Sequence, residues 1–475
     1  MGIFKVPPLP GFGMRPVPAD PSPYAVALLG EPQDLPKRTR LSLWLVRKDV
    51  LKMGCNNKKL DYHDNFIRQA MFDTVQAFSI SKRVNPYHLN DVFFLPLDLR
   101  KSSPGIPWAP RFKNRGEVMD NPQARQSIRY LWHQIKLGQD KDLPDCKILY
   151  RAHMKVDGAP KIRAVYGYPT TVTLAEAQFA LPLINAYKEG LHPIAYGYDM
   201  ALGGAMKLRR EIHAFKHYAC LDFSGFDKSV SADLIKFAFS VLESNINFSQ
   251  YKDSGIPDAR KLHRVWEKLV DYFINTTMRM PTGERFKKTA GVPSGSFFTQ
   301  LIDSIVNYFL ITYASYVTTS VRPHYLKVFG DDSVMGSDYP IPLWRMCEVL
   351  DGLGMSVSPT KSISTSNLDQ IEFLGFTLSG GFPQRSNKKW LSSLYYPEYP
   401  DARWDNFASR ALGLFYANSG VNMSMHFLFQ SIVYLTDFEL TFSRDFLRYM
   451  QLMGIEPGGL AKVLPSHGAM LMRLL

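Results

Sequence analysis

The 475-residue chain has 45% hydrophobic and 21% charged residues, which is typical of a folded protein and excludes wholesale disorder. Its length suits about three average domains or one large multi-lobed body. The formal net charge of +13 is spread along the chain. This favours a long polyanion such as nucleic acid as partner, with simple solubility as the alternative. The four scattered cysteines predict neither a zinc site nor disulfides, and they indicate a reducing compartment.

The sequence predicts no export leader and no membrane span. No charged-then-apolar segment opens the chain. The longest apolar stretch, from Phe297 to Thr319, is interrupted by Gln300, Asp303 and Asn307, so an amphipathic core helix is expected there. Residues 1 to about 36 are rich in Pro and Gly, which favours an extended arm, with a disordered tail as the alternative.

A turn-rich segment covers residues 101–108 and reads Lys-Ser-Ser-Pro-Gly-Ile-Pro-Trp. It combines the hydroxyls of Ser102 and Ser103 with the backbone at Gly105. Such a segment either offers hydrogen-bond donors to a phosphate backbone or only connects two elements. The pattern alone does not decide between these interpretations.

Basic and apolar residues alternate from Tyr150 to Pro169, and Asp157-Gly158 would turn a hairpin between the two halves. Lys155 lies on one arm, while Lys161 and Arg163 share a face of the other. A strand face with several cations is either an edge guarded against aggregation or a cradle for phosphate.

A short apolar run ends at Asp222, and Ser224-Gly225 turns the chain toward a helix that is predicted to begin near Ser231. Asp222 and Asp227 are five residues apart, so a continuous strand would send them to opposite faces. The turn allows both carboxylates to serve one pocket. The alternative is that they are acids at helix caps.

A glycine-punctuated loop containing Ser294 and Gly295 leads into the predicted core helix. Thr299, Asp303 and Asn307 follow at four-residue spacing and share one face of that helix. Small polar groups aligned beside a flexible loop suit a hydroxyl-bearing ligand. A buried polar network inside a helical core is the alternative.

Two apolar runs between Tyr325 and Met335 flank Gly330-Asp331-Asp332. Gly330 can supply the positive φ of a tight hairpin turn, so two adjacent carboxylates are expected at the tip of a hairpin. A Gly-Asp-Asp turn by itself is usually a solvated surface turn. Together with Asp222, however, these carboxylates are what nucleotidyl transfer with two divalent ions needs.

The segments resemble, in order, the motifs of the viral RNA-dependent RNA polymerases, most closely those of partitiviruses and next those of picobirnaviruses. The matching residues are Asp222 and Asp227 for motif A; Ser294, Gly295, Thr299 and Asn307 for motif B; and Gly330-Asp331-Asp332 for motif C. Further similarities are Lys361 to motif D, Phe373-Leu374-Gly375 to motif E, Lys155, Lys161 and Arg163 to motif F, and Ser102 to Pro107 to motif G.

The resemblance implies roles for these residues. Two Mg²⁺ ions, or Mn²⁺ in their place, would be held by Asp222 and Asp331, with Asp332 and the carbonyl of Phe223 as auxiliary ligands. Lys361 would protonate the departing pyrophosphate. The nucleotide and its triphosphate would contact Lys155, Lys161, Arg163, Asp227, Ser294, Gly295, Thr299, Asp303 and Asn307, and the template backbone would contact Ser102, Ser103 and Gly105.

One position departs from the pattern of many positive-strand relatives. They carry an asparagine nine residues after the motif B serine, where this chain has Asp303. An ionised carboxylate accepts a hydrogen bond from a ribose 2′-hydroxyl but cannot donate one. Beside Asp227 it would also add like-charge strain.

The resemblance implies an α+β fold of the right-hand type, with fingers, a palm built on an antiparallel sheet, and a helical thumb. The expected division is an N-terminal arm and fingers over 1–100, further fingers over 101–216 with the basic hairpin at 150–169, palm over 217–253 and 291–384, a fingers insertion over 254–290, and thumb over 385–475.

The implied function is replication and transcription of a viral RNA genome from ribonucleoside triphosphates. The implied partners are the RNA template, the product duplex and the viral capsid protein, for a monomer located in the virion interior and the host cytoplasm. A reverse transcriptase is one alternative, but that family places a bulky aromatic residue where Asp227 stands. A non-catalytic RNA-binding or capsid-associated protein is the other, and it would not need clustered carboxylates in this order.

Overall fold

The computed structural model describes residues 2–8, 19–155, 158–253, 255–456, 458, 460 and 463–475. It confirms the predicted mixed α+β class, with many helices packed around a five-stranded, a four-stranded and a two-stranded sheet. The strands are β1 Gly2–Lys5, β2 Cys146–Ala152, β3 Ile162–Gly167, β4 His217–Cys220, β5 Thr277–Arg279, β6 Glu284–Lys287, β7 Tyr325–Phe329, β8 Asp332–Ser337, β9 Ile363–Thr365, β10 Glu372–Phe373 and β11 Phe376–Thr377.

The helices follow the chain from one end to the other. They are α1 Pro23–Leu29, α2 Leu43–Val50, α3 Asn65–Ala77, α4 Leu89–Val92, α5 Arg115–Asp120, α6 Pro122–Lys136, α7 Thr170–Glu189, α8 Gly204–Ile212, α9 Phe226–Ser229, α10 Ala232–Ser244, α11 Ala259–Ile274, α12 Thr299–Thr319, α13 Leu343–Gly352, α14 Asn387–Tyr395, α15 Trp404–Asn418, α16 Met423–Leu435, α17 Arg444–Leu452 and α18 His467–Met472. No helix in the described part of the chain is long and apolar enough to cross a membrane.

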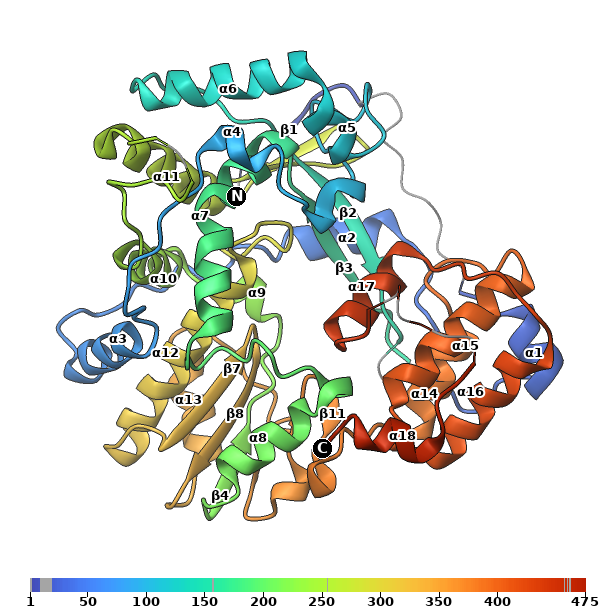
Figure 1. The fold of residues 1–475 in the computed structure, drawn as a ribbon. Coiled ribbons are helices and arrows are strands. Elements are labelled where there is room, and N and C mark those ends of the chain that lie inside the picture. The colour runs from blue at the N-terminus through green and yellow to red at the C-terminus, as the bar shows by residue number, and fades with distance from the viewer. Residues whose placement is uncertain are drawn as a thin grey trace.

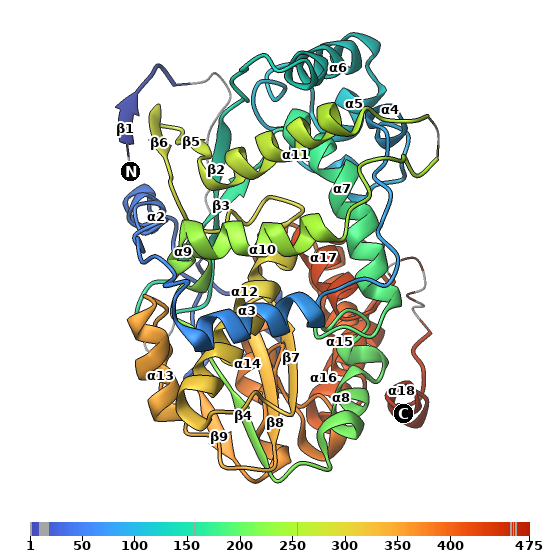
Figure 2. The ribbon, with the colours of Figure 1, turned by 90° about the vertical axis from the view of Figure 1, so that its left-hand side faces the viewer.

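The four-stranded sheet has the order β7-β8-β4-β9, with every neighbouring pair antiparallel. Alternate residues of its strands enter two different hydrophobic cores, because successive side chains of a strand point to opposite faces. Ala219 and Met335 belong to the core that includes α12, while Tyr218 and Val334 belong to the core formed with α8 and the C-terminal helices. Figure 2 shows α3 lying across the α12 side, where it packs on α12. Burial on both faces makes this sheet a rigid support.

The five-stranded sheet has the order β1-β6-β5-β2-β3. The predicted basic hairpin is confirmed, since β2 and β3 pair antiparallel with Arg151 opposite Arg163. Val156 and Asp157 of the expected turn lie outside the described residues. The strand β3 is an edge strand of this sheet, so the N–H and carbonyl groups on its outer side need hydrogen-bond partners outside the sheet.

The expectation of an N-terminal arm without regular structure is wrong at two places. Residues 2–5 form β1, which pairs with β6, and residues 23–29 form α1. Pro23 begins that helix, a position where its missing N–H costs no hydrogen bond. The rest of the expected arm includes residues 9–18, which lie outside the described residues.

The predicted helical C-terminal region is confirmed as α14 to α18. Its buried side chains form the second core, which also takes in residues from α8 and from the four-stranded sheet. Figure 1 shows α14, α15 and α16 on the opposite side of the molecule from the four-stranded sheet, with α1 next to them. The strands β2 and β3 run toward the C-terminal helices in the same view.

Candidate active site

The strands β7 and β8 are joined by the two-residue loop Gly330-Asp331, because Phe329 pairs directly with Asp332. Gly330 has φ +65°, as the first loop position of a type II′ turn requires. The side chains of Asp331 and Asp332 both reach solvent. The hairpin was therefore predicted correctly, although Asp332 is the first residue of β8 and not part of the tip.

The hairpin loop is held from behind by α12. The N–H of Gly330 donates to Ser304 Oγ at 2.9 Å, and Asn307 Nδ2 donates to the carbonyl oxygens of Gly330 (2.9 Å) and Asp332 (3.2 Å). Ser304 and Asn307 are fully buried. Asn307 was expected to contact a nucleotide, but the structure places its amide in the buried polar network that was the alternative interpretation. Ser304 was missed, because a serine within an apolar helix carries no signal of its own.

Asp222 follows the central strand β4 by two residues and lies next to the hairpin. The β4–β8 ladder pairs His217 with Ser337, and the same register continued along the strands places Asp222 level with Asp332. This arrangement brings carboxylates from two separate strand ends to one end of the sheet.

The backbone at Asp222 is fixed on its other side by the segment before β9. Its N–H donates to Ser362 Oγ at 2.9 Å, and its carbonyl oxygen accepts the N–H of Ser358 at 2.8 Å. Phe223 forms an isolated bridge with Val357. Lys361, the residue before Ser362, is exposed at the same end of the sheet.

The acids influence one another electrostatically. Desolvation by the surrounding protein raises the pKa of Asp332 to about 7, and the negative charges of Asp331 and Asp222 add to this rise. Desolvation also raises the pKa of Asp331, while Arg163 and Lys161 oppose the increase. The three carboxylates and the two cations therefore share one electrostatic environment.

The basic strand supplies the positive charge of this site. Lys161 lies just before β3 and Arg163 within it. Burial lowers the pKa of Lys161, and the charges of Arg163 and Lys361 lower it further, whereas Asp222 and Asp331 raise it. Lys361 is thus close enough to belong to the same cluster. Lys155 lies beyond the end of β2, beside the undescribed turn.

The Ser-Gly loop packs directly on β3. The exposed Ser294 accepts the N–H of Tyr166 at 3.4 Å through its hydroxyl oxygen. A Cβ at Gly295 would lie 1.6 Å from the carbonyl oxygen of Tyr166, so only glycine fits there. The hydroxyl of Thr299 donates to the Pro293 carbonyl oxygen at 2.6 Å and so shapes this loop itself.

Asp227 and Asp303 face the same region from α9 and α12. The carbonyl oxygen of Asp227 accepts the N–H of Val292 at 2.6 Å, which ties α9 to the Ser-Gly loop. Asp303 is buried, and its Oδ1 has no hydrogen-bond partner among the described residues. Burial raises the pKa of Asp303 well above its usual range, and the charges of Asp227 and Asp331 add to this effect.

The segment 102–105 is a rigid loop anchored at the start of α7. The hydroxyl of Ser102 donates to the Leu99 carbonyl oxygen at 2.6 Å, and Arg115 Nε donates to the carbonyl oxygen of Ser103 at 3.0 Å. Gly105 has φ +70° and lies so close to Pro169 that a Cβ would approach its Cα to 2.7 Å. The Ser102 hydroxyl and the Ser103 carbonyl oxygen thus hold the shape of this loop.

A family model described as viral RNA-dependent RNA polymerase matches residues 59–422. The chain belongs to this family. The family predicted from the motifs is therefore confirmed, and the match covers every site residue that the sequence predicted.

Similar proteins include RNA-directed RNA polymerases of the predicted partitivirus type. That of Atkinsonella hypoxylon virus is 26% identical over 330 residues, which is 60% of this chain and 50% of the relative. That of White clover cryptic virus 1 is 25% identical over 295 residues (56% and 47%), and that of Cryptosporidium parvum virus 1 is 25% identical over 363 residues (72% and 63%). The chain spans about half the length of the first two relatives.

Members of this polymerase family generally use divalent metal ions. The carboxylates of Asp222, Asp331 and Asp332 are the hard oxygen donors that Mg²⁺ prefers, and their mutual repulsion favours a cation among them. Among the described residues, no three His, Cys, Asp or Glu side chains are arranged to hold a metal ion. The donor chemistry therefore fits a divalent ion, whereas the side chains are not in a coordinating arrangement.

Glu176 is a buried acid beside the Ser-Gly loop that the sequence did not reveal. It is buried in α7, where it accepts the hydroxyl of Ser296 at 2.7 Å and the N–H of Phe297 at 2.9 Å. Burial raises its pKa to about 8. An acid inside the apolar run of residues 170–189 was the only available signal, and it does not indicate a partner more than 100 residues away along the chain.

Proposed function

We propose that this chain is an RNA-directed RNA polymerase that replicates and transcribes a viral RNA genome from ribonucleoside triphosphates. The observation that carries the proposal is the meeting of Asp222 with the Gly330-Asp331-Asp332 hairpin at one end of the sheet, within electrostatic reach of Lys161 and Arg163. Carboxylates that can hold metal ions, next to cations that can bind a triphosphate, are the groups that nucleotidyl transfer requires.

In this proposal, Asp222 and Asp331 hold two Mg²⁺ ions, for which Mn²⁺ can substitute, and Asp332 and the Phe223 carbonyl are auxiliary ligands. When bound, such ions activate the attacking 3′-hydroxyl and stabilise the leaving pyrophosphate. The pairing of β7 with β8 and the contacts from α12 fix the backbone on either side of Asp331, so the turn holds this acid at a defined place.

The basic residues of the proposed site have two roles, one toward the bound triphosphate and one toward the leaving pyrophosphate. Lys155, Lys161 and Arg163 bind the triphosphate through charge-assisted hydrogen bonds. Lys361, which is exposed in the segment before β9, donates a proton to the departing pyrophosphate. The charge of Lys361 lowers the pKa of Lys161, which supports a position of Lys361 near the triphosphate site.

The ribose and the template occupy two further parts of the proposed site. Asp227, Ser294 and Asp303 recognise the ribose 2′-hydroxyl, supported by the unpartnered oxygen of Asp303 and the exposed hydroxyl of Ser294. Gly295 and Thr299 shape the loop that carries Ser294. The template backbone passes the loop with Ser102, Ser103 and Gly105, whose rigidity suits the positioning of a phosphate chain.

The fold is proposed to be a right hand. The palm comprises residues 217–253 and 291–384, the fingers residues 1–216 with the insertion 254–290, and the thumb residues 385–475. The buried four-stranded sheet that carries the carboxylates and the packing of the C-terminal helices on the second core support this division. The proposed partners are the RNA template, the product duplex and the viral capsid protein, for a monomer that works in the virion and the host cytoplasm.

The test is RNA synthesis by the purified chain on a defined RNA template with Mg²⁺ or Mn²⁺. We expect a polymer from ribonucleotides and far less from deoxyribonucleotides, whereas a reverse transcriptase would show the opposite preference. Asp331→Asn should abolish synthesis, because it removes a proposed metal ligand while keeping the side-chain size. The control is Asp338→Asn, which changes an exposed acid just beyond the other end of β8. Wild-type protein that makes no polymer under these conditions would refute the proposal.

A further inference from the structure

The basic hairpin is held in place by residues that precede the family match. That match begins at residue 59, whereas α2 and the segment 37–39 lie before it. The N–H of Lys155 donates to the Lys37 carbonyl oxygen at 2.8 Å, and the N–H of Lys161 donates to Thr39 Oγ1 at 2.8 Å. Thr39 is buried. Two of the three proposed triphosphate ligands therefore have their backbone fixed by this one short segment.

Asp49, at the end of α2, fixes the backbone next to Arg163, the third proposed triphosphate ligand. Its Oδ2 accepts the N–H of Ala164, the residue after Arg163, at 2.8 Å. Its Oδ1 pairs with Lys228 Nζ at 2.6 Å. The side chains of Asp49 and Lys228 are only 10% and 12% exposed, so solvent screens this ion pair little. Lys228 directly follows Asp227 in α9, so one carboxylate joins β3 to the helix that carries the proposed ribose ligand.

The outer position of β3 explains why these contacts matter. An edge strand has a row of N–H groups without a neighbouring strand. Here Ala164 donates to Asp49, and Tyr166 donates to Ser294 of the Ser-Gly loop. The outer edge of β3 is thus bonded by the side chains of Asp49 and Ser294, and these bonds hold the strand in place relative to Asp222 and Asp331.

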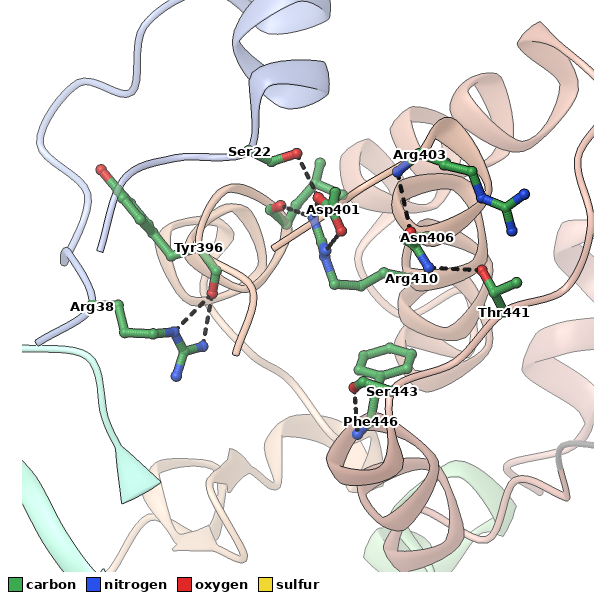
Figure 3. A network of polar contacts seen from close by, with 11 residues as sticks. Ser22, Arg38, Tyr396, Asp401, Arg403, Asn406, Arg410, Thr441, Ser443 and Phe446 are labelled. Carbon is green, nitrogen blue, oxygen red and sulfur yellow. Dashed lines mark hydrogen bonds and ion pairs between the residues drawn. The ribbon is translucent and has the colours of Figure 1, made fainter. Parts of the chain in front are cut away.

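The same segment reaches the C-terminal helices through Arg38. Its guanidinium donates to the Tyr396 carbonyl oxygen at 2.7 Å and to the Ala152 carbonyl oxygen at 2.7 Å. Figure 3 shows Arg38 on Tyr396 and, nearby, Ser22 on Asp401, both linking the N-terminal segment to the C-terminal helices. The hairpin is therefore held between two parts of the molecule.

We infer that Asp49 is a positioning residue for the triphosphate site, and that residues 37–49 hold the basic strand at its working distance from the catalytic carboxylates. The inference rests on the proposed function of the hairpin. Asp49 touches neither substrate nor metal; it acts through the backbone of β3 and through Lys228.

The test is Asp49→Asn, which keeps the size and one acceptor but removes the charge that pairs with Lys228. We expect the KM for ribonucleoside triphosphates to rise about tenfold with kcat within about twofold of wild type, the pattern of lost binding. Thr39→Val removes the oxygen that accepts the Lys161 N–H, and it should raise KM about threefold because the loss is one neutral hydrogen bond. If Asp49→Asn does not fold, Thr39→Val alone decides.

The matched control is Asp145→Asn. Asp145 forms a comparable part-buried ion pair with Arg285, at 2.6 Å, at the opposite end of β2 from the hairpin turn. It should lower the melting temperature as Asp49→Asn does while leaving KM unchanged. An equal rise of KM in the control, or a wild-type KM in both Asp49→Asn and Thr39→Val, would overturn the inference.

A second measurement separates this inference from the proposed function. The affinity of a fluorescent ribonucleoside triphosphate, followed by anisotropy with Mg²⁺, does not require catalysis. If wild-type protein makes no RNA, the proposed function fails, and the inference is judged on this affinity alone. Weaker binding by Asp49→Asn than by Asp145→Asn supports it, and equal binding refutes it.

Discussion

At Asp303 a carboxyl group lies fully inside the protein with one oxygen unpaired among the described residues. Burial and the nearby acids Asp227 and Asp331 raise its pKa, which favours the protonated form. A protonated carboxyl group both donates and accepts hydrogen bonds, as an asparagine amide does. A protonated Asp303 can therefore make the same kinds of hydrogen bond as the asparagine that many positive-strand relatives carry at this position.

Asp303→Ala is expected to weaken the preference for ribonucleotides. The substitution removes a buried carboxyl group on α12 whose Oδ1 has no partner in the described structure and which interacts electrostatically with Asp227 and Asp331. A lost hydrogen bond to a neutral partner corresponds to about a fivefold to tenfold change in preference. The measurement is the ratio of ribo- to deoxyribonucleotide incorporation, with Asp303→Asn as the conservative variant that retains most of it. An unchanged ratio in both variants would argue against sugar recognition by this residue.

Glu176 is expected to make stability depend on pH. Burial raises its pKa from 4.5 to about 8, so between these values the folded chain keeps a proton that the unfolded chain has released. The free energy of unfolding therefore falls as pH rises through this window. Glu176→Gln lacks the titration and should gain stability over wild type with rising pH, by up to about 1.4 kcal/mol per pH unit. Denaturant unfolding of both proteins at several pH values measures this; a pH-independent difference would contradict it.

At the scale of elements, local patterns in the sequence predicted the parts of the site well. The Gly330 turn, the end of β4 before Asp222 and the polar face of α12 each depend on residues close together in the chain. The contacts that hold these parts together could not be predicted in the same way. Asn307 bonding the hairpin and Asp49 bonding β3 join segments 23 and 115 residues apart, and no short pattern encodes such pairings.

The link between α12 and the hairpin is expected to be needed for catalysis. Asn307→Leu keeps the approximate size but leaves the Gly330 and Asp332 carbonyl oxygens without their buried donor. The expected cost is about 1–3 kcal/mol of unfolding free energy, and kcat should fall because Asp331 loses its fixed direction.

Denaturant unfolding and single-nucleotide turnover measure these two effects. Thr312→Val is the control, because Thr312 is buried on the same helix and its hydroxyl has no partner among the described residues. It should leave both quantities near wild type. A variant at Asn307 that loses stability but keeps the wild-type kcat would show that the link only supports the fold.

At the scale of the molecule, two hydrophobic cores meet at the four-stranded sheet. The first core includes α3, α7, α10 and α12, and the second includes α8 and the C-terminal helices. The N-terminal segment lies against the second core, where Tyr24 packs on Trp404 and Phe407. The N-terminal segment is thus joined to the C-terminal helices by aromatic packing and by a few polar contacts.

One of these contacts is the hydrogen bond that the Ser22 hydroxyl donates to Asp401 (Figure 3). Asp401 also forms a buried ion pair with Arg410, and the two side chains are 3% and 9% exposed. Asp401→Asn leaves the Arg410 cation buried without a counter-charge, a change that costs about 3–5 kcal/mol. Because Asp401 and Arg410 both lie within the second core, we expect that core to melt first, as a separate calorimetric transition below that of the sheet and the first core.

Asp20→Asn is the control, since Asp20 and Arg40 form an ion pair in the same N-terminal segment but are 81% and 79% exposed, and it should leave the melting profile unchanged. A single transition at the wild-type temperature in Asp401→Asn would mean that the two cores unfold as one unit without help from this pair.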